Sequence, residues 1–169
     1  MTVFNAFSVF LWDERFFTFA TSDGTNEAGM TTYDRKKENF IASTSFASMT
    51  SQKPIGVTSD GTYVVWLSNG GPDATLTGVD AQTATIRWKQ PRTGQVYVDG
   101  GAIGPDDTIY MLLQSATALT LQAVNPETGA ELWSVIVASM PGPDISWGPY
   151  LLQDGSFIIS HNNTVYNYK

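Results

Sequence analysis

The sequence predicts an all-β chain built from a repeated unit of about 46 residues, and two observations carry this prediction. The first is that residues 76–89 (LTGVDAQTATIRWK) match residues 121–134 (LQAVNPETGAELWS) without a gap at the Leu, Val, Asp/Asn, Thr and Trp positions. The second is an Asp-led turn, followed by β-forming residues, that recurs with nearly even spacing at Asp13, Asp60, Asp106 and Asp154. Such spacing indicates one supersecondary unit copied about four times.

Each unit is predicted to contain four short strands joined by turns. In the second unit the strands are expected within 55–59, 62–68, 75–79 and 85–89, and the third unit repeats the pattern up to residue 137. The Asp60-Gly61 pair favours a hairpin, because glycine adopts positive φ at little cost. Gly-Pro-Asp at 71–73, 104–106 and 142–144 is typical of loops. No stretch has the apolar period of an amphipathic helix.

Four short antiparallel strands repeated at this interval are typical of a β-propeller blade. In residues 62–68 both alternating sets of side chains are mostly apolar, as expected for a sheet covered on both faces. We expect a single propeller domain over residues 1–169, with a last blade that lacks its fourth strand. The expected blades span about residues 7–46, 54–91, 101–138 and 148–169.

At these residues the chain resembles the PQQ-like, quinoprotein-type propeller repeat, which ends in x-x-Thr-Gly-x-x-x-Trp. The third unit matches this pattern, the second carries Ala84 in place of the glycine, and the first carries Ala42 in place of the tryptophan. The resemblance implies that the motif tryptophans dock between adjacent blades, with a structural role for Trp88, Gly129 and Trp133.

Charge and composition exclude several function classes. Nine basic against sixteen acidic residues give a net charge of −7, so the chain is not expected to bind nucleic acid. The absence of cysteine excludes disulfides and thiolate metal sites. No apolar run is long enough for a membrane span. The compartment stays open, although low charge and abundant Ser and Thr favour an extracellular or cell-envelope protein slightly.

Catalysis is not expected. The resemblance implies that an enzyme of this family would hold PQQ with an adjacent Cys-Cys pair, a calcium or lanthanide ion and a catalytic Asp, and this chain has no cysteine and no suitable acid cluster. We therefore predict no enzyme activity, no catalytic residue, no cofactor and no metal. His161 is interpreted as a solvated hairpin residue, and the repeated aspartates as supports of their own turns.

Candidate contacts for a partner lie on the loops that enter the inner strands, near residues 46–54, 91–101 and 138–149. Aromatic and charged side chains there suit a sugar or a protein surface. For Trp147 the alternative is that it packs at the start of an inner strand. The predicted binding residues are Arg92, Tyr97, Asp99, Asp144 and Trp147.

The unfinished fourth blade leaves three architectures open. A second copy completes an eight-bladed ring, the chain closes as a four-bladed ring, or it belongs to a longer polypeptide; the self-completing homo-oligomer ranks first. The predicted function is a non-catalytic module for protein–protein interaction or assembly, with a protein or a second copy as partner. The alternative is a carbohydrate-binding, lectin-like propeller with a glycan partner, and a fragment of a quinoprotein dehydrogenase ranks third.

Overall fold

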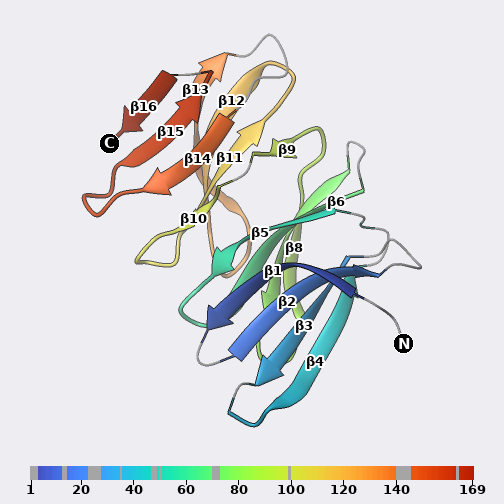
Figure 1. The fold of residues 1–169 in the computed structure, drawn as a ribbon. Coiled ribbons are helices and arrows are strands. Elements are labelled where there is room, and N and C mark those ends of the chain that lie inside the picture. The colour runs from blue at the N-terminus through green and yellow to red at the C-terminus, as the bar shows by residue number, and fades with distance from the viewer. Residues whose placement is uncertain are drawn as a thin grey trace.

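The computed structural model describes residues 4–12, 15–22, 28–34, 36–46, 49, 51–69, 73–98, 100–139, 146–162 and 164–169, with side chains from Gly29 onward except at 51, 146 and 147. These residues form sixteen strands and no helix, and every strand pairing is antiparallel (Figure 1). The predicted all-β class is therefore confirmed.

The first two sheets each contain four strands in sequence order, so every connection within a sheet is a hairpin. The first sheet consists of β1 (Phe4–Trp12), β2 (Arg15–Ser22), β3 (Ala28–Asp34) and β4 (Asn39–Phe46). The second sheet consists of β5 (Ser51–Val57), β6 (Thr62–Ser68), β7 (Ala74–Asp80) and β8 (Ile86–Pro91).

The third sheet has an inner edge made of two short strands, which both pair with β11. The fourth sheet has three strands among the described residues. The third sheet consists of β9 (Val96–Tyr97), β10 (Ala102–Ile103), β11 (Ile109–Gln114), β12 (Ala118–Val124) and β13 (Glu131–Ser139). The fourth consists of β14 (Ser146–Leu151), β15 (Phe157–His161) and β16 (Thr164–Tyr168).

The four sheets stand in a row in sequence order, with the first and the fourth at opposite ends (Figure 1). Neighbouring sheets meet through their inner strands, because β5 contacts both β1 and β10, and β10 contacts β14. The described residues do not close this row into a ring. The arrangement is propeller-like, with each sheet's inner strand turned toward the same side.

The core lies between the sheets rather than inside any one of them. Tyr63, Val65 and Leu67 of β6 pack toward Met30 and Phe46 of the first sheet. The alternate residues of β6, Val64 and Trp66, pack with Ile109 and Met111 of the third sheet. A further cluster joins Leu112 and Leu121 to Phe157 and Ile159 of the fourth sheet. Each middle sheet is thus buried on both faces, which explains its continuous apolar strands.

The segment 91–101 differs from the open loop that the sequence predicts. Residues Val96–Tyr97 form β9, which pairs with the end of β11, and the backbone bends at Gly100, where φ is 104°. The neighbouring Gly101 fits because a Cβ there would lie 2.7 Å from Ile55 Cγ2. Most of this segment is therefore part of the packed inner edge, since the bend lets the chain leave and rejoin the same strand.

Candidate functional site

The repeated aspartates each hold their own turn. Asp60, Asp106 and Asp154 each accept a hydrogen bond from the backbone N–H of the residue two positions later, at 3.0, 3.2 and 3.0 Å. The hydroxyl of that same residue, a Thr or a Ser, also donates to the carboxylate. The interpretation of these three acids as turn supports is confirmed, and Asp13 lies outside the described residues.

Arg87 links the turn of Asp60 to a second turn of the same sheet, which begins at Asp80. Its guanidinium forms ion pairs with Asp60 and, at 2.7 Å, with Asp80 Oδ2. Partial burial works to raise the pKa of Asp60, but hydrogen bonds from Thr58, Thr62 and Arg87 outweigh burial and hold that pKa at about 2. The pKa of Asp80 is lowered as well, because the hydrogen bonds from Arg87 and from the turn outweigh burial. Both carboxyl groups are therefore ionised near neutral pH, where they accept the hydrogen bonds of their turns and cannot donate a proton.

A second kind of turn joins the third and fourth strands of the first three sheets. The side-chain oxygen of Asp34, Asp80 or Asn125 accepts hydrogen bonds from the backbone N–H groups two and three positions later, at 2.8 to 3.0 Å. The residue four positions later has positive φ in each turn, and this residue is Glu38 (51°), Ala84 (54°) or Gly129 (70°). We call these segments the Asx turns, 34–39, 80–85 and 125–130.

Strand β8 and Arg92, the residue that follows it, dock onto the Asx turn of the next sheet through three side chains. Trp88 Nε1 donates to Pro126 O at 2.9 Å, Gln90 Nε2 to Thr128 O at 2.8 Å, and Arg92 Nη2 to Gly129 O at 3.1 Å. The indole fills the space between two glycines, because a Cβ on Gly78 would lie 2.3 Å from it and a Cβ on Gly129 would lie 2.5 Å from it. Trp88 is only 9% exposed as a result.

The junction between the first and second sheets satisfies the same acceptor in another way. Ala42 occupies the position that corresponds to Trp88, and it pairs across the strands with Thr32. The buried Thr32 hydroxyl donates to Ala81 O at 3.1 Å, and this carbonyl corresponds to that of Pro126 in the repeat. A threonine on the third strand thus replaces the tryptophan on the fourth as the donor.

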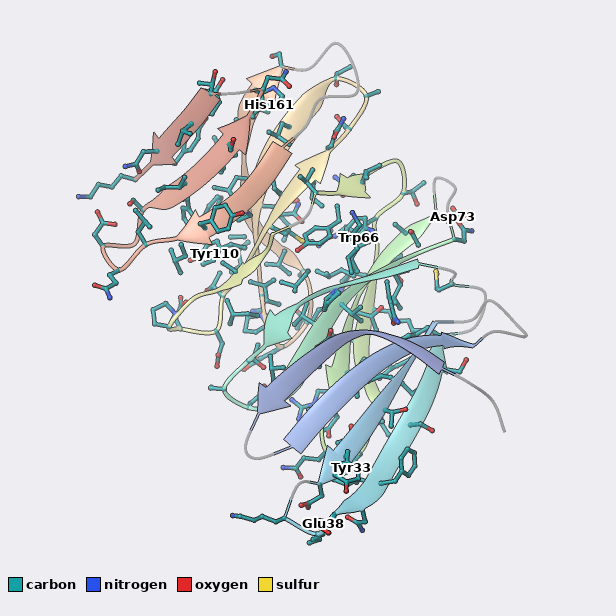
Figure 2. The ribbon with its side chains drawn as sticks, viewed as in Figure 1. Tyr33, Glu38, Trp66, Asp73, Tyr110 and His161 are labelled. Atoms are coloured by element: carbon teal, nitrogen blue, oxygen red, sulfur yellow. The ribbon has the colours of Figure 1, made fainter. Side chains whose placement is uncertain are left out.

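At the junction between the third and fourth sheets the corresponding tryptophan, Trp133, is 43% exposed. Its ring lies 6.1 Å from that of Tyr110, which in turn lies 4.6 Å from Phe157 of the fourth sheet. Tyr168 Oη donates to Val137 O at 3.2 Å and ties the end of β16 to β13. The junction is therefore packed near Tyr110 (Figure 2) and open near Trp133.

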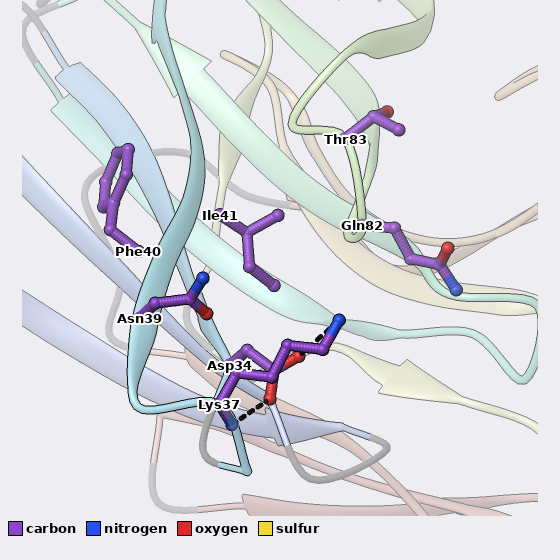
Figure 3. Close-up of a pocket in the computed structure, with 7 residues that line it drawn as sticks. All are labelled: Asp34, Lys37, Asn39, Phe40, Ile41, Gln82 and Thr83. Atoms are coloured by element: carbon purple, nitrogen blue, oxygen red, sulfur yellow. Dashed lines mark hydrogen bonds and ion pairs between the residues drawn. The ribbon is translucent and has the colours of Figure 1, made fainter.

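A pocket of about 380 Å³ lies beside the Asx turns of the first two sheets (Figure 3). Lys37 Nζ lies 4.0 Å from Asp34 Oδ2 at its rim. Figure 3 shows the ring of Phe40 on the opposite side of β4 from Ile41, Gln82 and Thr83, so the pocket is walled by Ile41 and by amide and hydroxyl groups. The pocket is lined by Asp34, Lys37, Asn39, Phe40, Ile41, Gln82 and Thr83.

The predicted binding residues do not gather into one exposed site. Arg92 is half-buried on the turn at 125–130, and burial lowers its pKa, against the charge of Glu131. Tyr97 is buried and stacks on Trp66, with ring centroids 5.8 Å apart, so its predicted place on an open loop is wrong. Asp99, Asp144 and the side chain of Trp147 lie outside the described residues.

The interpretation of His161 as a solvated residue is also wrong. The side chain ends β15 and is only 6% exposed, with Nε2 3.5 Å from Asn162 Nδ2. Over the described ranges, no three acidic or histidine side chains lie close enough together to hold a metal ion. The part of the chain that the structure describes also has no helix long and apolar enough to cross a membrane.

Sequence reasoning missed the hydrogen bonds of Gln90 and the open surface at Trp133. The first was readable from the strand period, because Gln90 and Arg92 follow the motif tryptophan at steps of two and share its face. The exposure of Trp133 could not be predicted from the sequence, because it depends on the structure: among the described residues, no Asx turn covers this side chain.

Comparisons with known proteins concern the fold. A europium-containing methanol dehydrogenase is similar over 79% of this chain and 27% of that chain, with a TM-score of 0.52 and 10% identity. An exo-beta-1,3-galactanase from Phanerochaete chrysosporium has a TM-score of 0.49, 13% identity and coverage of 93% and 43%. A protein of unknown function from Bacteroides caccae has a TM-score of 0.47, 11% identity and coverage of 85% and 64%. The chain spans less than two thirds of each of these structures.

No protein-family model matches the chain, and no curated protein is significantly similar to it. At 10% identity the likeness to the dehydrogenase shows the fold alone and supports a propeller-like arrangement. The same likeness contradicts the prediction that the chain is not an enzyme. That prediction rested on the missing cysteine pair and acid cluster, and a fold shared with an enzyme does not support it.

Proposed function

We propose that this chain is a propeller-type assembly module that associates with a second copy of itself through the two ends of the sheet row. Exposed apolar side chains at both ends carry this proposal. On the fourth sheet, Tyr150 and Val165 are exposed and lie on the face opposite to the buried Phe157 and Ile159. Exposed apolar surface on a sheet with no covering layer is typical of a protein interface.

The other end of the row offers a similar surface. Tyr33 and Phe40 are cross-strand partners in the first sheet and are both exposed. Tyr33 alternates with Thr32, whose side chain faces the second sheet, so the tyrosine faces away from it. In two copies related by a two-fold axis, the first sheet of each copy would pack against the fourth sheet of the other. The two copies would then complete a ring of eight blades built of PQQ-like repeats.

Sedimentation velocity of the intact chain over a range of concentrations tests this proposal. A dimer is expected, and the double variant Tyr150→Ser with Val165→Ser is expected to raise its dissociation constant at least about tenfold. Leu132→Ser is the matched control, because Leu132 is exposed on β13, away from both ends. A strict monomer at every concentration, or an equal effect of the control, contradicts the proposal.

A second candidate function, carbohydrate binding, is favoured by the pocket of Figure 3. The pocket is lined by the amides of Asn39 and Gln82, the hydroxyl of Thr83 and the apolar side chain of Ile41. Polar groups beside an apolar wall suit the hydroxyls and the ring of a sugar. A glycan array that finds one sugar class bound by the chain, with binding lost in Gln82→Ala and kept in Ile86→Ala, would replace the first candidate by this one.

A further inference from the structure

Two equivalent tryptophans of this chain differ in their exposure to solvent. Trp88 and Trp133 occupy the same position in consecutive repeats, and each pairs across its sheet with a small residue, Gly78 or Ala123. Trp88 is 9% exposed and Trp133 is 43% exposed. The element that covers Trp88 is the Asx turn 125–130 of the next sheet. Among the described residues, no corresponding turn covers Trp133.

The register of the fourth sheet shows where that element belongs. In the third sheet Val124 pairs with Ile109, and in the fourth sheet Tyr168 pairs with Phe157. Ile109 and Phe157 each lie three residues after the repeated aspartate, so Tyr168 corresponds to Val124 and Lys169 to Asn125. In the described chain, β16 pairs with β15 alone, and no Asx turn lies against Trp133.

The surface around Trp133 forms one half of a docking site. The exposed side chains of Trp133 and Val135 lie on the face of β13 that is turned toward the fourth sheet. The inner end of this face is closed by Tyr110 and Phe157, whose rings are 4.6 Å apart, and by the bond from Tyr168 to Val137. The outer end is bordered by the edge of β16 that pairs with no other described strand. We call this surface the Trp133 groove.

We propose that the Trp133 groove binds a turn-and-strand segment of another polypeptide, with an Asx residue at the start of the turn and glycine four positions later. The strand would pair with the free edge of β16, as β13 pairs with β12. The turn would cover Trp133 and accept a hydrogen bond from its Nε1 at the carbonyl after the Asx residue, as Pro126 O does from Trp88. β-Strand addition to an exposed edge is a general mode of peptide recognition.

Glycine is required because of the close approach of the ring. A Cβ on Gly129 would lie 2.5 Å from Trp88 Cε3, closer than real Cβ contacts occur. A second copy of this chain does not offer such a turn. Its turn at 34–39 has Glu38 at the glycine position, its turn at 80–85 has Ala84, and its turn at 125–130 is already covered by Trp88. The occupant is therefore not a second copy, and this inference concerns another surface than the proposed self-association.

The groove also specifies a more apolar occupant than the junction between the second and third sheets. The positions of Gln90 and Arg92, which donate to Thr128 O and Gly129 O, are taken in the third repeat by Val135 and Val137. A docked turn would thus receive one hydrogen bond from this face in place of three. Small or apolar side chains after the glycine would use the surface that Val135 leaves exposed.

A synthetic peptide of residues 125–139 tests the proposal, because it carries the required turn and the outer strand together. Its binding to the intact chain is measured by fluorescence anisotropy of a dye at its end. Saturable binding is expected, weakened at least about tenfold by Trp133→Ala in the protein and by Gly129→Val in the peptide. The indole N–H signal of Trp133 in an NMR spectrum, assigned with Trp133→Phe, is expected to shift on binding.

The control is Ile136→Ala in the protein, which removes an exposed side chain from the face of β13 opposite to Val135 and is expected to leave binding unchanged. Circular dichroism shows whether each variant is folded, and Trp133→Phe replaces Trp133→Ala if the latter is not. Absent binding, or binding that is equal with and without Trp133, overturns the proposal. The second result would mean that the peptide exchanges with β13. If Trp133→Ala abolishes dimerisation, the groove binds a second copy, and the proposal of a different partner is contradicted. If the chain dimerises but does not bind the peptide, this inference is contradicted and the proposed self-association stands.

Discussion

The six-membered ring of Trp88 lies against the backbone of Gly129, 41 positions further along the chain, with 2.5 Å between Trp88 Cζ3 and the place where a Cβ on Gly129 would stand. The two residues belong to different sheets, and this contact together with the bond from Trp88 Nε1 to Pro126 O joins those sheets. A close tryptophan–glycine contact therefore fixes how one sheet is placed on the next.

Gly129→Ala is expected to destabilise the chain by about 2–4 kcal/mol, because it adds a steric overlap to the cost of a left-handed conformation. Gly94→Ala separates the two effects. Gly94 has nearly the same φ, 74° against 70°, but has no atom within 4 Å of its Cβ position. The control is expected to cost only about 1 kcal/mol. Urea unfolding measures both, and equal losses would show that the ring does not lie against Gly129.

Trp88→Ala is expected to cost about 3–5 kcal/mol of the free energy of unfolding, as is usual for a large buried aromatic side chain. The same substitution at Trp133 is expected to cost about 1 kcal/mol, because nearly half of that side chain is already in contact with solvent. Thermal and urea unfolding of the two variants compares them directly. Similar losses would indicate that Trp133 is covered in solution.

Thr32→Val is expected to destabilise the junction of the first and second sheets by about 1–2 kcal/mol. The substitution keeps the shape of the side chain but removes the buried hydroxyl that donates to Ala81 O. Thr31→Val, one position earlier and on the other face of β3, serves as the control and is expected to change the free energy of unfolding by less than about 0.5 kcal/mol. A larger effect at Thr31 than at Thr32 would contradict the assigned faces of β3.

The low pKa of Asp60, which hydrogen bonds from Thr58, Thr62 and Arg87 maintain, predicts a loss of stability in acid. The pKa of Asp60 is about 2 in the folded chain against an ordinary value of 3.8, so its contribution is complete above pH 3.8 and disappears as the pH falls toward 2. Asp60 is 57% exposed, so solvent screening keeps the contribution of the ion pair below about 1 kcal/mol.

Arg87→Met is expected to flatten the pH dependence of unfolding in this window. Lys89→Met removes a nearby exposed cation on the same strand and is expected to leave the pH dependence unchanged. Unfolding midpoints between pH 4 and pH 2 measure both variants. An unchanged slope in Arg87→Met would assign the low pKa of Asp60 to the Thr58 and Thr62 hydrogen bonds alone.

The regular parts of this fold were predictable because they depend on local patterns. The repeated Asp and Asx turns satisfy their hydrogen bonds within three residues, so sequence spacing alone locates them. The nearly continuous apolar strands of the second and third sheets likewise indicate burial on both faces.

The errors concern residues whose surroundings depend on distant segments. Tyr97 is predicted to lie on the loop that enters an inner strand, but its ring stacks on Trp66 of another sheet. His161 was placed at a solvated turn because polar residues follow it, yet the pairing with Thr164 makes it the last residue of a buried strand. Such contacts arise only when two sheets meet, and no local pattern encodes them.

The most direct test of this account is a crosslink between β8 and the Asx turn of the next sheet. The chain has no cysteine, so the pair Gln90→Cys with Thr128→Cys can be joined by a short bifunctional maleimide and identified by peptide mass spectrometry. Because Gln90 Nε2 lies 2.8 Å from Thr128 O, we expect an intramolecular crosslink in most molecules. The pair Lys89→Cys with Thr128→Cys, on the opposite face of β8, is expected to react poorly. Equal crosslinking of the two pairs, or none in the first, would contradict the docking of consecutive sheets on which the account rests.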